Sequence, residues 1–349
     1  MLTAEKVKTR ALELGFDVVG IARAGRAPGA EAFLSWLEKG YYADMAWIAK
    51  NPERRSDVRN VVEGARSVVS VGLSYFVADP PADVWNDPLR GRIARYAWGL
   101  DYHDDMTPRL RELAAWIESE SGRPISNRAY VDTGPVLEGE WAVQAGLGFQ
   151  GKHTLMISPE WGSYLFLGEI LLDLDLEPDP VGGESRGTCG SCRRCQDACP
   201  THAFPAPYIL DSRLCISYLT IEHRGAIPEA LRSKMRNWIY GCDECQMVCP
   251  WVKQFSKPGN MRFLKYDVNW AAPSLVELLE LDDQGFRDRF RASPIPRTKR
   301  RGFLRNVCIA LGNSRQPDVA IPALEKVLTD PEPLIREHAE WAIQRLRAE

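Results

Sequence analysis

The chain has 349 residues, of which 45% are hydrophobic, and its formal net charge is −3. This length predicts two or three domains with ordinary cores, and the nearly balanced charge excludes a uniformly basic nucleic-acid-binding protein, although not a local basic patch. No apolar run approaches the roughly 20 residues of a membrane span, and the first residues predict an amphipathic helix instead of a signal peptide, so we expect a cytoplasmic protein with no membrane partner.

The N-terminal half alternates between helical and strand patterns. Helices are expected near residues 3–14, 29–39, 105–120 and 136–146, and strands near 17–23, 67–75, 91–98, 129–132, 153–158 and 163–174. This alternation predicts an α/β or α+β domain over residues 1–178. Residues 173–188 are rich in Asp, Glu, Pro and Gly, which indicates a linker into the next domain.

Two cysteine-rich stretches follow. Residues 189–200 have the pattern C-x2-C-x2-C-x3-C-P, by which bacterial ferredoxins bind cubane iron–sulfur clusters. Three of its thiolates bind one cluster, and the fourth crosses to a second. Residues 242–250 also end in C-P but hold only three cysteines, so the second cluster needs a further ligand. We expect this ligand to be Cys215, and we expect a helix over residues 228–239 to bring the chain back to the clusters.

The pattern predicts two [4Fe–4S] clusters, each with four thiolate ligands. The first set is Cys189, Cys192, Cys195 and Cys249, and the second is Cys199, Cys215, Cys242 and Cys245. Cys308 is left over. Zinc is the main alternative, because paired C-x2-C can bind a tetrahedral ion, but a zinc site has no use for the third cysteine or the two C-P endings. A disulfide framework is not expected in a reducing compartment.

The C-terminal part predicts a helical repeat. Residues 304–312 and 335–343 resemble each other at a spacing typical of HEAT-like helix pairs. Just before the repeat, residues 291–305 hold six basic residues and no acidic residue. Such a strip can bind phosphates, and the residues that we expect to do so are Arg297, Lys299, Arg300, Arg301 and Arg305. A solvated linker would explain the same charges.

Asp132 stands where an apolar strand gives way to Thr-Gly-Pro. In α/β folds such a position faces a ligand crevice, but an Asp there can equally cap a turn or a helix. Asp101 and His103 begin a D-x-H pattern by which some proteins ligate cobalamin. Met106 replaces the glycine that this pattern requires, so His103 is not expected to bind cobalt.

Together, these motifs resemble the epoxyqueuosine reductase family. The resemblance rests on residues 95–103, 131–135, 151–158 and 159–163, on both cysteine stretches and on the terminal repeat. It covers nearly the whole chain in the same order. It implies a cobalamin-dependent iron–sulfur enzyme that reduces epoxyqueuosine to queuosine at the wobble position of tRNA.

The resemblance also implies roles for single residues. Asp132 corresponds to the family's proton donor. The positions that correspond to cobalamin contacts are Arg55, Met156, Leu167 and Ser217. Some relatives have cysteine at the position of Ala94, which leaves a cobalamin contact there open. The implied architecture is a cobalamin-binding domain over residues 1–178, a ferredoxin-like domain with two clusters over 179–260 and a HEAT-like tRNA-binding domain over 261–349.

In the implied reaction, cob(I)alamin is the two-electron reductant, and the clusters pass on electrons from an external donor of the flavodoxin or ferredoxin type. A carboxylic acid protonates the departing oxygen. Two other functions stay open. The chain could be an iron–sulfur electron-transfer protein without cobalamin, or a corrinoid reductase of a small molecule with no tRNA substrate. A monomer is expected.

Overall fold

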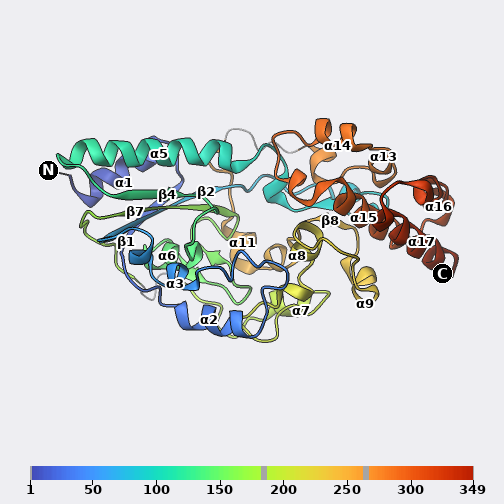
Figure 1. Cartoon of the computed structure of the whole chain (residues 1–349), viewed down its shortest axis with the longest axis horizontal. Helices are drawn as coiled ribbons and strands as arrows, with labels where there is room; N and C mark the ends of the chain where they lie inside the picture. Colours follow the sequence, from blue (N-terminus) through green and yellow to red (C-terminus); the bar gives the residue numbers. More distant parts are fainter. Residues whose placement is uncertain (1, 182–186, 262–266, 349) are drawn as a thin grey trace.

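The structure is a computed structural model that describes residues 2–181, 187–261 and 267–348 (Figure 1). Within these residues, a four-stranded antiparallel sheet of order β1-β2-β7-β4 forms the centre of the N-terminal half. Its strands are β1 (Val18–Arg23), β2 (Ser67–Ser74), β7 (Leu165–Leu172) and β4 (Asn127–Tyr130). The antiparallel pairing confirms the α+β alternative for this part of the chain.

Helices cover both faces of this sheet (Figure 1). They are α1 (Ala4–Glu13) and α5 (Tyr102–Ser121) on one face and α6 (Glu138–Gln144) on the other. Because side chains alternate between the faces of a strand, β7 presents Phe166 and Ile170 to the core on the α1 and α5 side. Leu167 and Leu171 join the core on the α6 side, and so Glu169 between them also faces α6.

The cysteine-rich part consists of short elements that pack against the end of the sheet. These include α7 (Arg194–Ala198), α8 (Ile216–Ile221), α10 (Glu244–Met247) and α11 (Pro250–Phe255). A parallel pair of short strands, β3 (Arg92–Ile93) and β8 (Trp238–Tyr240), joins it to the N-terminal half. Most of the expected helices and strands are present within a few residues of their predicted bounds.

Two expected elements were wrong over most of their length. The strand expected at 91–98 ends at Ile93 and continues as the 3-10 helix η2 (Arg95–Ala97), because the Arg95 backbone N–H turns to the buried carboxylate of Asp243. The helix expected at 228–239 is limited to α9 (Glu229–Arg232) and η5 (Ser233–Met235). Arg236, with φ of 55°, ends it, and the following residues pair with β3.

The C-terminal helices are α13 (Leu275–Leu279), α14 (Asp283–Arg289), α15 (Lys299–Gly312), α16 (Pro317–Lys326) and α17 (Pro333–Ala348). The two similar sequence segments fall in α15 and α17, which pack against each other. One continuous core reaches from Val7 in α1 to Leu346 in α17. The three predicted domains therefore share buried contacts, and their boundaries stay predictions.

In the described part of the chain, no helix is both long and apolar enough to cross a membrane.

Arg305 does not belong to the exposed basic strip, contrary to the prediction. It is completely buried in α15, and its guanidinium donates hydrogen bonds to the backbone carbonyls of Leu219, His223 and Gly225. Burial lowers the pKa of Arg305 to about 9. The residue joins α15 to the end of α8, and it has no surface from which to contact phosphate.

Replacing Arg305 with Met should therefore destabilise the fold. The substitution keeps most of the bulk but removes the donor from one buried and two partly buried carbonyls, so the free energy of unfolding should fall by about 3 kcal/mol or more. Urea unfolding measures this. The exposed Lys299 is the matched control, because Lys299→Met should change the free energy of unfolding by less than about 0.5 kcal/mol. Equal stability of the two variants would contradict the structural role of Arg305.

Candidate functional site

A cavity of about 350 Å³ lies beside the end of the central sheet. Its wall is aromatic and aliphatic, with two carboxyl groups. The lining residues are Tyr75, Tyr96, Tyr102, Phe166, Leu155, Met156, Leu165, Leu167, Gly139, Thr154, Ser163, Asp132 and Glu138. Six residues were expected at the cofactor site: Arg55, Ala94, Asp132, Met156, Leu167 and Ser217. The structure brings Asp132, Met156 and Leu167 together in this wall.

Asp132 is an exposed residue that follows β4 and is held in the left-handed backbone region, with φ of 56°. Its backbone N–H donates to Glu138 Oε1 at 2.6 Å, and its carboxylate accepts a hydrogen bond from the Tyr102 hydroxyl at 2.8 Å. Tyr102 is itself fixed by stacking on Phe166, with ring centroids 4.1 Å apart. These contacts hold the Asp132 carboxyl group at the cavity.

The helix-cap interpretation of Asp132 is wrong. The residue at the N-cap of α6 is Leu137, and no side chain caps this helix. Glu138 in the first turn of α6 instead accepts the Asp132 N–H, so the contact runs from the loop to the helix side chain. The Asp132 carboxyl group thus lines the cavity and does not cap α6.

A third carboxyl group, that of Glu169, is buried next to Glu138. Among the described residues, its oxygens find no donor other than the neighbouring Glu138 carboxyl. Burial raises the pKa of Glu169, and burial together with the charge of Asp132 raises the pKa of Glu138 to about 8. Because two buried carboxylates so close together cannot both be charged, the pair holds at least one proton at neutral pH.

The other residues expected at the cofactor site do not line the cavity. Arg55 is next to the Asp132 loop, where its Nη1 donates to the carbonyl of Gly134 at 3.3 Å. Ala94 is buried beneath Gly241 and Ser217 lies in α8, and neither of them lines the cavity. His103 also lies outside its wall, with Nδ1 bonded to Asp101.

The predicted cysteine sets are each brought together. A cavity of about 120 Å³ is lined by Cys189, Cys192, Cys195 and Cys249, which are the four members of the first set. In the second set, burial and then the charge of Cys215 raise the pKa of Cys245, and Cys215 has Cys199 as a charged neighbour. Burial and then the neighbouring Cys245 raise the pKa of Cys242. Cys308 lies apart in the core.

All nine cysteines are free, so the structure has no disulfide framework. Within the described residues, no three His, Cys, Asp or Glu side chains converge as a single metal ion would require. A cubane cluster binds each thiolate through a separate iron, so it does not need ligands that converge on one point.

Two contacts join the cysteine sets to the larger cavity. The hairpin of β5 (Phe149–Gln150) and β6 (Met156–Ile157) carries Lys152, whose backbone N–H donates to Cys189 Sγ at 3.4 Å. Three residues of the same hairpin line the larger cavity. On its far wall, Ser163 Oγ donates to Gln246 Oε1 at 2.8 Å, and Gln246 follows Cys245 in α10.

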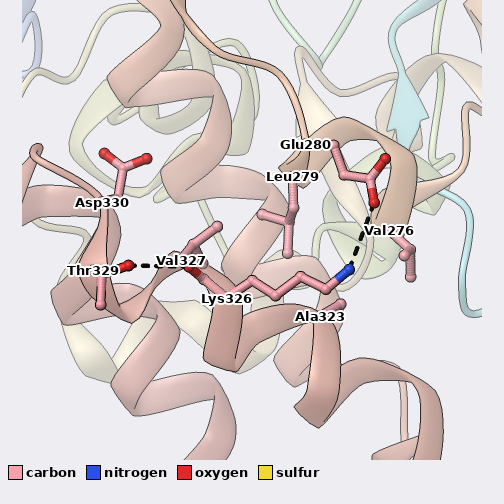
Figure 2. Close-up of a pocket in the computed structure, with 8 residues that line it drawn as sticks. All are labelled: Val276, Leu279, Glu280, Ala323, Lys326, Val327, Thr329 and Asp330. Atoms are coloured by element: carbon pink, nitrogen blue, oxygen red, sulfur yellow. Dashed lines mark hydrogen bonds and ion pairs between the residues drawn. The ribbon is translucent and has the colours of Figure 1, made fainter.

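Another cavity, of about 220 Å³, lies between α13, α16 and the 3-10 helix η7 (Val327–Thr329) (Figure 2). Lys326 Nζ and Glu280 Oε1 form an ion pair of 3.6 Å across it. None of the predicted site residues lines this cavity. It is a gap between packed helices, and we do not assign a function to it.

The basic strip is smaller than predicted. Arg300 donates to Asp330, and both side chains are largely buried, so this pair holds α15 to the start of α17. Arg297 and Lys299 are exposed and Arg301 is half-buried. These three residues, called the basic strip below, keep access to solvent.

Sequence reasoning missed Tyr102, Glu138 and Glu169. A usable signal existed for Glu169, because it is the one carboxyl group within the apolar run 165–172. A charge in such a run is costly unless it has a partner or a proton. Glu138 and Tyr102 carry no comparable signal, because their roles depend on contacts between distant segments.

The carboxyl pair predicts a pH-dependent stability. The folded protein keeps the Glu138 proton up to a pKa of about 8, whereas the unfolded chain releases it near 4.5. Between these values the folded state binds more protons, so its free energy of unfolding should fall as pH rises, by at most about 1.4 kcal/mol per pH unit for this group. In Glu138→Gln this fall should be shallower, as measured by urea unfolding from pH 5 to 8.

The exposed Glu160 provides the control, since Glu160→Gln should keep the slope of the wild type. Identical slopes for all three proteins would mean that Glu138 titrates normally.

Comparison with family models supports the two parts of the site. Residues 188–252 match the model of a 4Fe-4S double cluster binding domain. Residues 55–133 match the model described as epoxyqueuosine reductase QueG, DUF1730. The first match includes all eight predicted ligands, and the second ends one residue after Asp132.

Curated relatives and solved structures match over nearly the full length. The epoxyqueuosine reductase of Xanthomonas campestris pv. campestris is 42% identical over 343 residues, which cover 97% of this chain and 95% of that protein. The one from Pseudomonas aeruginosa is 40% identical, with 98% and 94% covered. A crystal structure of epoxyqueuosine reductase with an epoxyqueuosine-modified tRNA-Tyr stem loop is 31% identical with a TM-score of 0.88, and 98% of this chain and 89% of that chain are covered.

A Bacillus subtilis epoxyqueuosine reductase, whose catalytic loop is described as swung out of the active site, has a TM-score of 0.87 at 30% identity, with 98% of this chain and 90% of that one covered. Identity of this size over the whole length, with the cysteine sets and the cavity in one molecule, shows that the chain belongs to the epoxyqueuosine reductase family.

Proposed function

We propose that this protein reduces epoxyqueuosine to queuosine in tRNA, with cobalamin and two [4Fe–4S] clusters as cofactors and Asp132 as the proton donor. The observation that carries the proposal is the position of Asp132. Its carboxyl group lines a cavity whose wall is bonded to both the Cys189 loop and the Cys245 helix. A cavity with an acid and adjoining cluster ligands suits a reduction that consumes protons.

The cavity wall fits one face of a corrinoid. Leu165, Leu167 and Met156 offer an apolar surface, and the aromatic rings of Tyr96 and Phe166 extend it. Arg55, which bonds to the carbonyl of Gly134 in the Asp132 loop, would supply a cation for polar groups at the edge of the ring. None of the residues that line the cavity is His or Cys, so the wall provides no such ligand to cobalt. When bound and reduced, cobalamin would supply the two-electron reductant that no side chain can provide.

The reaction consumes protons, and side chains of the protein can supply them. Removing the epoxide oxygen as water leaves a carbon–carbon double bond and consumes two electrons and two protons. Asp132 can deliver one proton to the oxygen as the carbon–oxygen bond breaks. The proton held by Glu138 and Glu169 lies next to the Asp132 loop and is a source for the second. Tyr102, whose pKa is raised by burial, keeps its own proton and orients the Asp132 carboxylate.

The two electrons must come singly, because iron–sulfur clusters exchange one electron at a time. We infer an external donor of the flavodoxin or ferredoxin type, a cytoplasmic location and a monomeric enzyme. The basic strip of Arg297, Lys299 and Arg301 lies on the C-terminal part, where it can bind the phosphates of the tRNA substrate.

Asp132→Asn tests the proposed function. The amide preserves the shape of the side chain and can still accept a hydrogen bond from Tyr102, but it cannot give a proton to the departing oxygen. Single-turnover conversion of an epoxyqueuosine-containing stem-loop by pre-reduced enzyme should slow by about 10²- to 10⁴-fold. Binding of cobalamin and of the stem-loop should stay unchanged. A variant that turns over within a few-fold of the wild type would show that Asp132 is not the acid.

The cluster assignment predicts different outcomes for two cysteines. After anaerobic reconstitution, the wild type should hold about eight iron and eight sulfide per chain. Cys215→Ser should damage one cluster and spare the other, as counted by iron analysis and electron paramagnetic resonance. Cys308→Ser is the control, and it should keep both clusters. Full iron content in Cys215→Ser would refute the assignment of this ligand.

A further inference from the structure

An exposed tryptophan, Trp47, lies between two arginines from distant parts of the chain. Its side chain is 48% exposed, which is unusual for a residue of this size. The Arg55 guanidinium carbon is 5.7 Å from the Trp47 ring, and that of Arg297 is 5.9 Å from it. Both guanidinium groups thus lie over the ring at cation–π distance. The exposed half of the side chain leaves part of the indole open to a ligand.

Trp47 stands close to the Asp132 loop. Arg55 donates to the carbonyl of Gly134, two residues after Asp132. On the other side, although burial lowers the pKa of Arg297, its hydrogen bond to Glu222 and the charge of Glu222 raise it, and the charge of Asp132 raises it further. Both arginines that flank the indole therefore also lie near the candidate acid. The tryptophan therefore lies near the Asp132 loop, although it does not line the cavity.

The loop of Trp47 is anchored to the cysteine-rich part. Asp44 accepts a hydrogen bond from the Tyr218 hydroxyl at 2.7 Å and lies 3.0 Å from His223 Nδ1. The Tyr218 hydroxyl accepts in turn from the backbone N–H of Asp44 at 3.2 Å. Arg297 is held from its other side by Glu222, on the segment that follows α8. The indole is thus presented on a braced surface, which lowers the entropic cost of binding a ligand there.

The chemistry of this surface favours an unpaired nucleobase. RNA loops are recognised by stacking of their splayed bases on exposed aromatic rings and by cations along the backbone. Trp47 supplies the ring, and the basic strip begins at Arg297, which touches that ring. A role in the protein core would bury the indole, whereas the structure leaves nearly half of it exposed.

We propose that Trp47 is a stacking platform for an unpaired nucleobase of the substrate's anticodon loop, with Arg55 and Arg297 holding the indole in place. This inference rests on the proposed function, because it takes an RNA loop as the ligand. It goes beyond that function by naming a side chain that binds unpaired bases. The neighbouring basic strip binds phosphates whether or not the bases are paired. Trp47 would therefore favour a loop over a duplex.

The test compares two RNA probes that bind to the full chain with its clusters reconstituted. One is an anticodon stem-loop and the other is a blunt duplex of equal charge, which has no unpaired base. Trp47→Ala should weaken stem-loop binding by roughly 5- to 150-fold, the range typical of losing one base–aromatic stack, and should leave duplex binding unchanged. Trp47→Phe should recover most of the loss, because it restores an aromatic face.

Salt dependence separates stacking from charge. Trp47→Ala removes no charge, so the slope of log K against log salt should stay that of the wild type. Replacing Arg297, Lys299 and Arg301 with Ala should instead reduce this slope and weaken both RNAs. Tyr208→Ala is the matched control, since Tyr208 is 45% exposed and lies on the cysteine-rich part; it should bind both probes as the wild type does.

Two results would overturn the stacking platform. One is stem-loop binding by Trp47→Ala within twofold of the wild type, and the other is an equal loss on the duplex. Unchanged iron content and thermal midpoint in the variant exclude misfolding as the cause of a loss, and rescue by Trp47→Phe supports the same conclusion. A wild type that binds neither RNA would contradict the proposed function as well as this inference. The two results above contradict the stacking platform alone, so the two failures can be told apart.

Discussion

The rest of the site depends on one constraint, which is that the cavity and the cysteine sets stay next to each other. In the proposed reaction, electrons must reach the substrate bond that is broken. The hydrogen bond between Ser163 and Gln246 joins the cavity wall to the helix of Cys245. The Lys152 contact with Cys189 does the same for the other cysteine set. The continuous core then follows, because the sheet, the cysteine segments and the C-terminal helices must be held as one body.

The same site keeps a proton on the buried pair Glu138 and Glu169, whose carboxyl groups would be ionised in water at neutral pH. Glu169 is fully buried on a strand that is otherwise apolar, and it costs stability unless it carries a proton. This destabilising residue lies directly beneath the loop of Asp132. Asp132 itself sits in the left-handed backbone region, which Asp adopts more readily than most non-glycine residues. The hydrogen bond from its backbone N–H to Glu138 connects the proposed acid directly to the buried pair.

The sequence predicted best those features that depend on local spacing. The cysteine runs predicted two ligand sets, and counting them pointed to Cys215, because the chemistry of a cubane cluster prescribes four ligands. The structure places the members of the first set around one cavity. The helices and strands with clear periodicity were also found. The strand at 91–98 failed beyond Ile93 because the Arg95 backbone N–H bonds to Asp243 instead of a strand neighbour. The helix at 228–239 failed because its last residues pair with β3, about 145 positions away. Arg305 was placed on the surface because a run of charges does not show which members face the core. Trp47 gave no signal at all, since its arginine neighbours come from two other segments.

The central claim is that the cavity beside Asp132 and the two cysteine sets serve one reduction on RNA. The most direct measurement is an anaerobic single turnover of the wild type, reconstituted with iron and sulfide, reduced chemically and mixed with an epoxyqueuosine-containing anticodon stem-loop. Mass spectrometry of the released nucleosides reports the outcome. The account predicts the loss of one oxygen atom to give queuosine, only when cobalamin has been added. Conversion without cobalamin, or an intact epoxide in the presence of the fully loaded and reduced enzyme, would contradict it.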